Sequence, residues 1–373
     1  MEMKDKIVKQ FKELVSIDSH SKEEGEIATY LSNLLEEWGL EVTTDDAGEK
    51  IDGETGNIIA KLKGDPDLPT LLFCAHMDTV IPGENVEAVI EDDVIYSQGD
   101  TILGSDDKAG ITAILGMLKA IQERDIEHGD IEIVFTVAEE IGLLGAKNLN
   151  YDLLEADLGI IYDSGGPIGT IVTQAPAQDQ INVEVIGKSA HAGLNPSGGV
   201  NAIKVSSMAI SNLNLGQIDE ETTANIGVIK GGHATNIVPD LVELEGEARS
   251  RDEDKLEQQI EHMIDIFEKS AKKYSAEVNI DVERMYSAFD LTESDPSVKL
   301  VVEAAKNLGV EPKLEATGGG SDANILNGQG IETVNLGVGM TDVHSTDENI
   351  KVKDLVDAVR YSVEIVKESA NLF

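Results

Sequence analysis

The chain has 373 residues, of which 71 are acidic and 29 basic, and its formal net charge is −42. A surface this acidic repels phosphate backbones, so we exclude nucleic acid as a partner. The single cysteine, Cys74, excludes an internal disulfide framework and a cysteine-based zinc site. No segment has the apolar length of a signal peptide or a membrane span, so we expect a cytoplasmic protein with no membrane contact.

The first part of the chain alternates between helical and strand patterns. Amphipathic helices are predicted over 1–17 and 22–39, and a continuous apolar strand over 68–80. Short strands at 41–48 and 56–64, a helix at 107–121 and strands at 131–140 and 158–166 complete the pattern. This order predicts an α/β fold with a mixed, mostly parallel sheet and helices on both faces.

The pattern changes over residues 177–288. Strand, helix, strand, strand, helix and strand follow one another at 180–187, 201–213, 223–232, 241–250, 254–274 and 276–286. The order βαββαβ is that of a ferredoxin-like sandwich. Helices at 297–309 and 352–369, with a strand at 330–339, then resume the first pattern. We therefore predict a discontinuous catalytic domain (1–176 and 289–373) with an inserted domain (177–288).

Two polar residues, His76 and Asp78, end the apolar strand at 68–80. Strand side chains alternate, so both are expected on one face. A neutral imidazole can bind a metal through one nitrogen while a carboxylate holds the other. A turn cap would use the same residues, so the pair alone does not decide between the two.

More potential ligands follow other predicted strands or lie at the start of the predicted helix at 107–121. They are Asp106, Asp107, Glu139, Glu140, Asp163 and His344. Open α/β sheets place their sites along the carboxyl edge of their strands. Helix capping could explain Asp106 and Asp107, but adjacent glutamates leaving a buried strand repel each other unless a cation or proton separates them. Carboxylates and imidazoles suit zinc, manganese or cobalt, and one bridging carboxylate is common between paired metals.

Seven motifs in this order resemble the peptidase T-like branch of the dinuclear-zinc aminoacylase and carboxypeptidase family. They are AHMDTV, GSDDKAG, TVAEEIGLLGAK, GKSAHAG, GGHATNIVPD, ATGGGSDAN and VHSTDE. The resemblance implies two Zn²⁺ per chain, with Co²⁺ or Mn²⁺ as substitutes. By this resemblance, His76 and Asp163 bind one zinc, Glu140 and His344 bind the other, and Asp106 bridges both. Asp78 supports His76, and Glu139 is the general base. It also implies a cis peptide bond after Asp106.

The resemblance assigns substrate contacts to the inserted domain and to the glycine loop. His191 would stabilise the oxyanion, often in the partner subunit, and Asn236 would hydrogen-bond the substrate. Arg249 would pair with a substrate carboxylate, although a surface ion pair explains it as well. Gly319 and Gly320 would let the backbone approach the substrate, or would form a loop ending in a serine helix cap.

The implied activity is hydrolysis of amide bonds in short peptides by a zinc-bridged hydroxide. The favoured prediction is a tripeptide aminopeptidase. An N-acyl amino acid deacylase or a carboxypeptidase would use the same metal core. A non-catalytic binding protein is disfavoured because Glu139 and every implied ligand are present. The nearly uncharged helix at 201–213 and the resemblance together predict a homodimer through the inserted domain.

Overall fold

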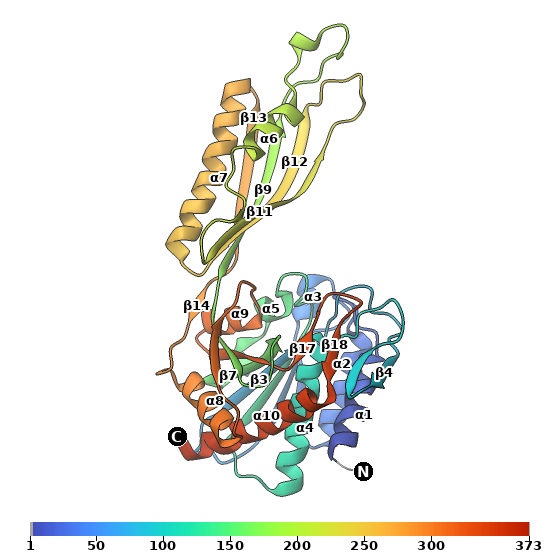
Figure 1. Ribbon diagram of the computed structural model, residues 1–373, viewed down its shortest axis with the longest axis vertical. Helices are drawn as coiled ribbons and strands as arrows, with labels where there is room; N and C mark the ends of the chain where they lie inside the picture. Colours follow the sequence, from blue (N-terminus) through green and yellow to red (C-terminus); the bar gives the residue numbers. More distant parts are fainter. Residues whose placement is uncertain (1–2, 373) are drawn as a thin grey trace. The chain divides into compact units, whose positions relative to one another are not determined.

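The computed structural model describes residues 3–372, which form two compact units (Figure 1). The first contains the described residues through Thr173, then Leu291–Ala316 and the described residues from Ser321 onward. The second contains Gln174–Asp290 and the short segment Thr317–Gly320. The chain thus leaves the first unit after Thr173 and returns to it at Leu291. The four residues Thr317–Gly320, which follow this return, belong to the second unit.

A nine-stranded sheet in the order β1-β2-β6-β3-β7-β16-β8-β14, with β15 also on β8, organises the first unit. The strands are β1 (Glu41–Thr44), β2 (Ile58–Leu62), β3 (Leu71–His76), β6 (Ile131–Thr136), β7 (Leu158–Ser164), β8 (Thr170–Ala175), β14 (Phe289–Asp290), β15 (Lys313–Ala316) and β16 (Glu332–Gly337). The four central strands β6, β3, β7 and β16 are parallel, and the flanking strands β2 and β8 pair antiparallel. The predicted mixed α/β fold is confirmed.

Helices cover both faces of this sheet. They are α1 (Met3–Val15), α2 (Gly25–Glu37), α3 (Ala47–Ile51), α4 (Ser105–Arg124), α5 (Leu144–Asn148), α8 (Pro296–Asn307), α9 (Asp322–Gly328) and α10 (Val352–Leu372). Phe135 packs in the core cluster with residues of α4 and α10, whereas the Thr136 hydroxyl donates to Asp322 at the start of α9. Successive strand residues point to opposite faces, so α9 lies across the sheet from α4 and α10.

The central strands are apolar because both of their faces are covered. Every residue of β3 and β6 is buried, and the Phe73 and Tyr162 rings stack within the core with centroids 6.3 Å apart. The tyrosine hydroxyl donates to Ser362 of α10 at 2.6 Å. Glu132, near the start of β6, is buried in an ion pair with Lys61 of β2 at 2.7 Å. The other charged residues of β3, β6 and β7 lie at or just after the carboxyl ends of these strands, along one edge of the sheet.

The second unit is a five-stranded antiparallel sheet with two helices. Its elements are β9 (Ala177–Ile186), α6 (Ala202–Ile210), β10 (Gly216–Gln217), β11 (Thr222–Gly231), β12 (Leu241–Ser250), α7 (Glu253–Tyr274) and β13 (Glu277–Tyr286). The strand order β10-β11-β12-β9-β13 is ferredoxin-like, with β10 as a short addition. Leu256, Ile260, Met263 and Phe267 of α7 recur at helical spacing and are buried in this unit's own core.

Several elements differ from the sequence predictions. The strand predicted over 41–48 ends as β1 at Thr44, and the short helix α3 begins at Ala47, within the predicted strand. A small sheet of β4 (Ala88–Glu91), β5 (Val94–Ser97), β17 (Met340–Thr341) and β18 (Asn349–Lys351) was also missed, because its strands are too short for a periodic signal. Residues 1–2 of the predicted first helix lie outside the described residues. No helix within residues 3–372 is long and apolar enough to cross a membrane.

Candidate metal site

Three parallel strands bring the polar residues to one edge of the sheet. His76, the last residue of β3, lies in register with Thr136, the last residue of β6. Glu139 and Glu140 follow β6 after a short turn, and Asp163 lies near the end of β7. Since β6, β3 and β7 are neighbours, their carboxyl ends meet at this edge, as expected for an open α/β sheet.

The ring of His76 has one nitrogen free to bind a cation. Its Nδ1 lies 2.9 Å from the backbone carbonyl oxygen of Asp78, which can only accept, so this nitrogen carries the proton. In the neutral ring Nε2 then presents a lone pair, 3.1 Å from Asp106 Oδ1 and 3.9 Å from Asp163 Oδ1. A lone pair facing carboxylate oxygens requires a proton or a cation between them.

His344 approaches the other oxygen of Asp106. Its Nε2 lies 3.3 Å from Asp106 Oδ2 and 3.0 Å from Glu140 Oε1. Hydrogen bonds with these two carboxylates raise the pKa of His344 to about 10, against the desolvation of the half-buried ring. Burial lowers the pKa of His76, but hydrogen bonds with Asp106 and Asp78 raise it well above its usual value. Both imidazoles therefore lie where a positive charge is strongly favoured.

Asp78 contacts the His76 ring and also holds the turn that follows β6. Its carboxylate lies 3.5 Å from His76 Nδ1, farther than its own backbone carbonyl, so the expected carboxylate–histidine contact is the weaker of the two. The carboxylate instead accepts hydrogen bonds from Ser21 Oγ at 2.6 Å and from the backbone N–H groups of Glu139 and Glu140 at 2.9 and 3.2 Å. Asp78 thus fixes the turn that presents both glutamates.

Glu139 has the environment of a proton carrier. Its side chain is buried, and none of the hydrogen bonds found among the described residues involves its carboxylate. Burial raises the pKa of this carboxyl well above its usual value, and the negative charges of Asp322, Glu140 and Asp78 add to the shift that His76 opposes. A carboxyl with a raised pKa can hold and release a proton near neutral pH.

Two further carboxylates, Asp107 and Asp322, are buried beside this cluster. One oxygen of each, Asp107 Oδ2 and Asp322 Oδ1, has no hydrogen-bond partner within residues 3–372. Burial raises the pKa of Asp107 well above its usual value and that of Asp322 to about 6. The nearest buried lysine, Lys108, donates to the backbone carbonyl of Ile17 at 2.7 Å instead. The cluster therefore carries more negative charge than its own cations neutralise.

The residues present fit divalent cations. The ligand atoms of His76, Asp106 and Glu140 lie within 4.8 Å of one another. The donors are imidazole nitrogens and carboxylate oxygens, which suit zinc, manganese and cobalt. Asp106 presents one oxygen to the His76 and Asp163 side and the other to the His344 and Glu140 side. The peptide bond between Asp106 and Asp107 is cis, as the resemblance implied.

Glu348 holds the segment that carries Asp106. The sequence analysis did not predict this role for Glu348. Its buried carboxylate accepts hydrogen bonds from the N–H groups of Leu103, Gly104, Ser105 and Asp106 and from the Ser105 hydroxyl, at 2.6–3.2 Å. Because Glu348 follows His344 by four residues, this one carboxylate ties together the two loops that supply these candidate ligands. VHSTDE was recognised as a motif, but its final residue was given no role.

Two of the residues expected to contact substrate, His191 and Asn236, lie together in the second unit. Ala192 N–H donates to the Asn236 carbonyl at 2.9 Å, and His191 forms a β-bridge with Ile237. The N–H groups of Gly193 and Leu194 donate to His191 Nδ1 at 3.2 and 3.1 Å. Accepting these bonds leaves Nδ1 without a proton, so the neutral ring of this exposed histidine carries its proton on Nε2.

Arg249 is already engaged in the second unit. Its Nε and Nη2 donate to the two carboxylate oxygens of Glu247 at 3.1 and 2.9 Å, which is the ion pair considered as the alternative. Gly319 and Gly320 also belong to this unit, and a Cβ on Gly320 would lie 2.3 Å from the ring of Tyr286. A larger residue at position 320 would therefore force the Tyr286 ring to move. Ser321 forms the expected helix cap through a capping box with Asn324.

Fold and sequence together define the class of protein. Residues 72–368 match peptidase family M20/M25/M40, and the chain belongs to that family, whose enzymes are metal-dependent. The resemblance inferred from the motifs is thereby confirmed.

The chain also resembles individual proteins over nearly its whole length. It is 41% identical to the structure of aminopeptidase PepT from Bacillus cereus, with a TM-score of 0.91 and coverage of 99% of this chain and 100% of that one. It is 42% identical to a tripeptidase structure from Staphylococcus aureus, with a TM-score of 0.94 and 99% coverage of both chains. Peptidase T of a Geobacillus strain is 28% identical over 98% of both sequences.

Replacing Glu348 with glutamine should destabilise the protein. In the variant, an NH2 group would replace one carboxylate oxygen and would face backbone N–H groups that donate to that oxygen in the wild type. Each buried N–H group that loses its acceptor costs about 1–3 kcal/mol of stability. We expect Glu348→Gln to lower the unfolding free energy measured in urea by at least about 2 kcal/mol. Asp347→Asn, at the exposed neighbouring carboxylate, is the control and should change it little. Equal stability of the two variants would contradict the anchoring role.

Glu24 should give a pH-dependent stability difference. Its buried carboxyl accepts from Lys22 N–H and Ala138 N–H, while Oε2 has no partner among the described residues. Burial and the charge of Asp78 raise its pKa from 4.5 to about 7. A raised pKa means that this group's stabilisation is complete below pH 4.5 and is lost as the pH rises through 7.

Glu24→Gln resembles the protonated carboxyl and does not titrate. The unfolding free energy of both proteins should be measured in urea at pH 5 and at pH 8. Relative to the wild type, the unfolding free energy of the variant should be about 2 kcal/mol higher at pH 8 than at pH 5. Glu23→Gln, at the exposed neighbour, should show no such gain. A difference that stays constant with pH would mean that Glu24 is ionised throughout.

Proposed function

We propose that this protein is a dinuclear metallopeptidase that removes the N-terminal residue from short peptides, with tripeptides as its preferred substrates. The observation that carries the proposal is the position of Asp106, whose two oxygens face His76 on one side and His344 on the other. The names of its relatives in Bacillus cereus and Staphylococcus aureus, an aminopeptidase and a tripeptidase, support the substrate class.

Two divalent cations would share Asp106, zinc first and cobalt or manganese as substitutes. His76 and Asp163 would complete one site, and Glu140 and His344 the other. When bound, such a pair polarises an amide carbonyl and makes water acidic enough to react near neutral pH. This arrangement also explains why so many carboxylates converge with few cations of the chain beside them.

Glu139 would act as the general base. It is assigned to neither cation, and burial raises its pKa toward the range in which a base works best. Its carboxylate takes a proton from the attacking water and passes that proton to the leaving amine. Asp78 keeps this carboxylate in place by accepting the Glu139 backbone N–H.

His191 would stabilise the oxyanion of the tetrahedral intermediate. Its Nδ1 accepts two backbone N–H groups, so Nε2–H is the donor left for a substrate oxygen. Asn236, linked to the same turn, would hydrogen-bond the substrate. Arg249 would recognise a substrate carboxylate while sharing its guanidinium with Glu247, beside the glycine loop of Gly319 and Gly320.

Hydrolysis of acylated amino acids or removal of C-terminal residues would use the same centre. The zinc-loaded protein should therefore be incubated with tripeptides, dipeptides and acetylated amino acids, and the products identified by mass. Release of the free N-terminal residue from tripeptides supports the proposal. Release only of acetate or of C-terminal residues would assign one of the other two activities. A cytoplasmic location stays a prediction that cell fractionation can test.

A homodimer through the second unit is part of the proposal. Only a two-residue strand, β10, pairs with the outer edge of β11, so most of that edge is open. The side chains of Ile203 on α6 and Ile229 on β11 are 41% and 52% exposed. Ala202, Val205 and Ala209 of α6 are buried against the sheet of their own unit, which leaves Ile203 for contact with another chain. An exposed apolar face beside an open strand edge suits a second copy of the chain.

Replacing Glu139 with glutamine should abolish turnover while two metals still bind. Glutamine cannot take a proton, and general bases usually contribute about 10²–10⁴-fold. Tripeptide hydrolysis and the metal content of the purified variant are the two measurements, with Glu127→Gln at an exposed site as the control. Activity within about tenfold of the wild type would remove the general-base role. Loss of metal would instead make Glu139 a ligand.

Subunit exchange should show whether His191 serves the neighbouring copy. A His191→Ala chain and a Glu139→Gln chain, each inactive alone, should regain activity when mixed. The mixed dimer would contain one site with both groups intact. Failure to recover, with exchange proven by labelled chains, would place His191 in its own chain's site or outside catalysis. A monomer by light scattering would end the dimer proposal.

A further inference from the structure

The turn that follows β6 carries Glu139 and Glu140 outside any helix or strand. The backbone N–H groups of the four successive residues 137–140 each donate to a side-chain oxygen. The acceptors are Asn57 Oδ1 for Val137 at 3.1 Å, Glu24 Oε1 for Ala138 at 2.8 Å, and the two oxygens of Asp78 for Glu139 and Glu140 at 2.9 and 3.2 Å. These acceptors lie just before α2, just before β2 and just after β3, so three separate parts of the chain hold this turn.

Glu24 is the acceptor that lies immediately before α2, and its side chain is completely buried. Its Oε1 accepts the Ala138 N–H and also the Lys22 N–H, at 2.8 and 2.9 Å. Within residues 3–372 it forms no ion pair that would compensate for its burial. A buried carboxyl is costly unless hydrogen bonds satisfy it. The two N–H groups are therefore the contacts that account for a glutamate at this position.

The Ala138 N–H belongs to a residue in an unusual backbone conformation. Ala138 has a φ of +50° and lies directly before Glu139. A residue with a Cβ adopts this left-handed conformation only where its surroundings hold it there. The hydrogen bond to Glu24 is such a constraint. Without it, the backbone at Ala138 could relax and would turn the next residue, Glu139, away from its present direction.

The Glu139 side chain depends on this backbone more than the Glu140 side chain does. Glu140 Oε1 lies 3.0 Å from His344 Nε2, so a second loop fixes that carboxylate. By contrast, none of the hydrogen bonds found among the described residues involves the Glu139 carboxylate. The direction of the Glu139 side chain is therefore set mainly by the backbone that carries it.

We propose that Glu24 is a positioning residue for Glu139. By holding the Ala138 N–H, it directs the Glu139 carboxylate toward the water that attacks the peptide bond. This inference rests on the proposed function, in which Glu139 is the general base. Glu24 would contact neither the substrate nor a cation. Because a displacement of about 1 Å can slow a reaction by about 10²-fold, loss of the contact should lower the rate of catalysis rather than weaken substrate binding.

The test replaces Glu24 with methionine, which has a similar length but only a weak acceptor, and with glutamine, which keeps Oε1. On the metal-loaded protein, Glu24→Met should lower kcat for a tripeptide by at least about tenfold, while KM changes by less than about threefold. Glu24→Gln should keep kcat within about twofold of the wild type, because its carbonyl oxygen can accept both N–H groups. The metal content of both variants should equal that of the wild type.

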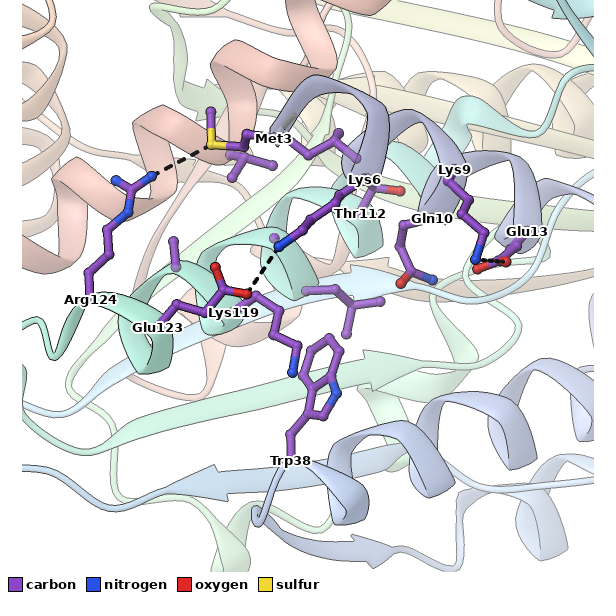
Figure 2. Close-up of a pocket in the computed structure, with 15 residues that line it drawn as sticks. Met3, Lys6, Lys9, Gln10, Glu13, Trp38, Thr112, Lys119, Glu123 and Arg124 are labelled. Atoms are coloured by element: carbon purple, nitrogen blue, oxygen red, sulfur yellow. Dashed lines mark hydrogen bonds and ion pairs between the residues drawn. The ribbon is translucent and has the colours of Figure 1, made fainter. Parts of the chain in front are cut away.

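Two control variants separate positioning from a general loss of stability or charge. Tyr361→Phe removes a buried hydrogen bond from α10 to the Val301 carbonyl of α8, and Glu123→Gln breaks an exposed ion pair with Lys6 (Figure 2). Both controls should retain kcat, although Tyr361→Phe should lower the unfolding temperature. A kcat for Glu24→Met that is no lower than that of Tyr361→Phe or Glu24→Gln would overturn the inference. Loss of metal from Glu24→Met would also overturn it, because the effect would then lie on Glu140.

Amide hydrogen exchange of residues 137–145 separates failure of this inference from failure of the proposed function. Exchange in this segment should be at least about tenfold faster in Glu24→Met than in Glu24→Gln, since a buried N–H group has lost its acceptor. If the wild type hydrolysed neither peptides nor acylated amino acids, the proposed function would be wrong, and the exchange alone would decide whether Glu24 holds the turn. Equal exchange in the two variants would overturn the inference whatever their activity.

Discussion

The structure depends on one carboxylate, that of Asp106, between two imidazoles. His76 approaches one of its oxygens from the end of β3, and His344 approaches the other from a loop near the C-terminus of the chain. Burial opposes ionisation of Asp106, yet the two histidines keep its pKa well below the usual value. Such a group is stable only with positive charge on both sides, and divalent cations supply that charge most directly.

The surrounding fold keeps these groups in place from several directions. Parallel strands align the ends of β3, β6 and β7, and Asp78 fixes the turn that carries Glu139 and Glu140. Glu348 holds the backbone from Leu103 to Asp106. These supports are themselves buried acidic groups, so the site concentrates negative charge that a packed interior would otherwise avoid. The cations would make that arrangement favourable.

The sequence predicted the candidate ligands because they occupy a repeated position. His76, Glu140 and Asp163 each lie at the end of an apolar strand or directly after it, which periodicity alone can locate. Glu348 and Glu24 could not be found in this way. The partners of Glu348 lie 242–245 residues away along the chain, and the partner that links Glu24 to the site, Ala138, lies 114 residues away. Asp322 was visible only as part of a glycine-rich loop. The α/β alternation and the ferredoxin-like insertion were strong signals, whereas the short sheet containing β17 and β18 was too brief to give one.

Diffraction from crystals of the zinc-loaded protein, measured on either side of the zinc absorption edge, tests the account most directly. We predict two anomalous peaks about 3.5–4 Å apart, as in paired-metal hydrolases. Each peak should lie about 2.0–2.2 Å from a different oxygen of Asp106, one on the His76 side and one on the His344 side. A single peak, or two peaks that do not share Asp106, would contradict the central role given to this carboxylate.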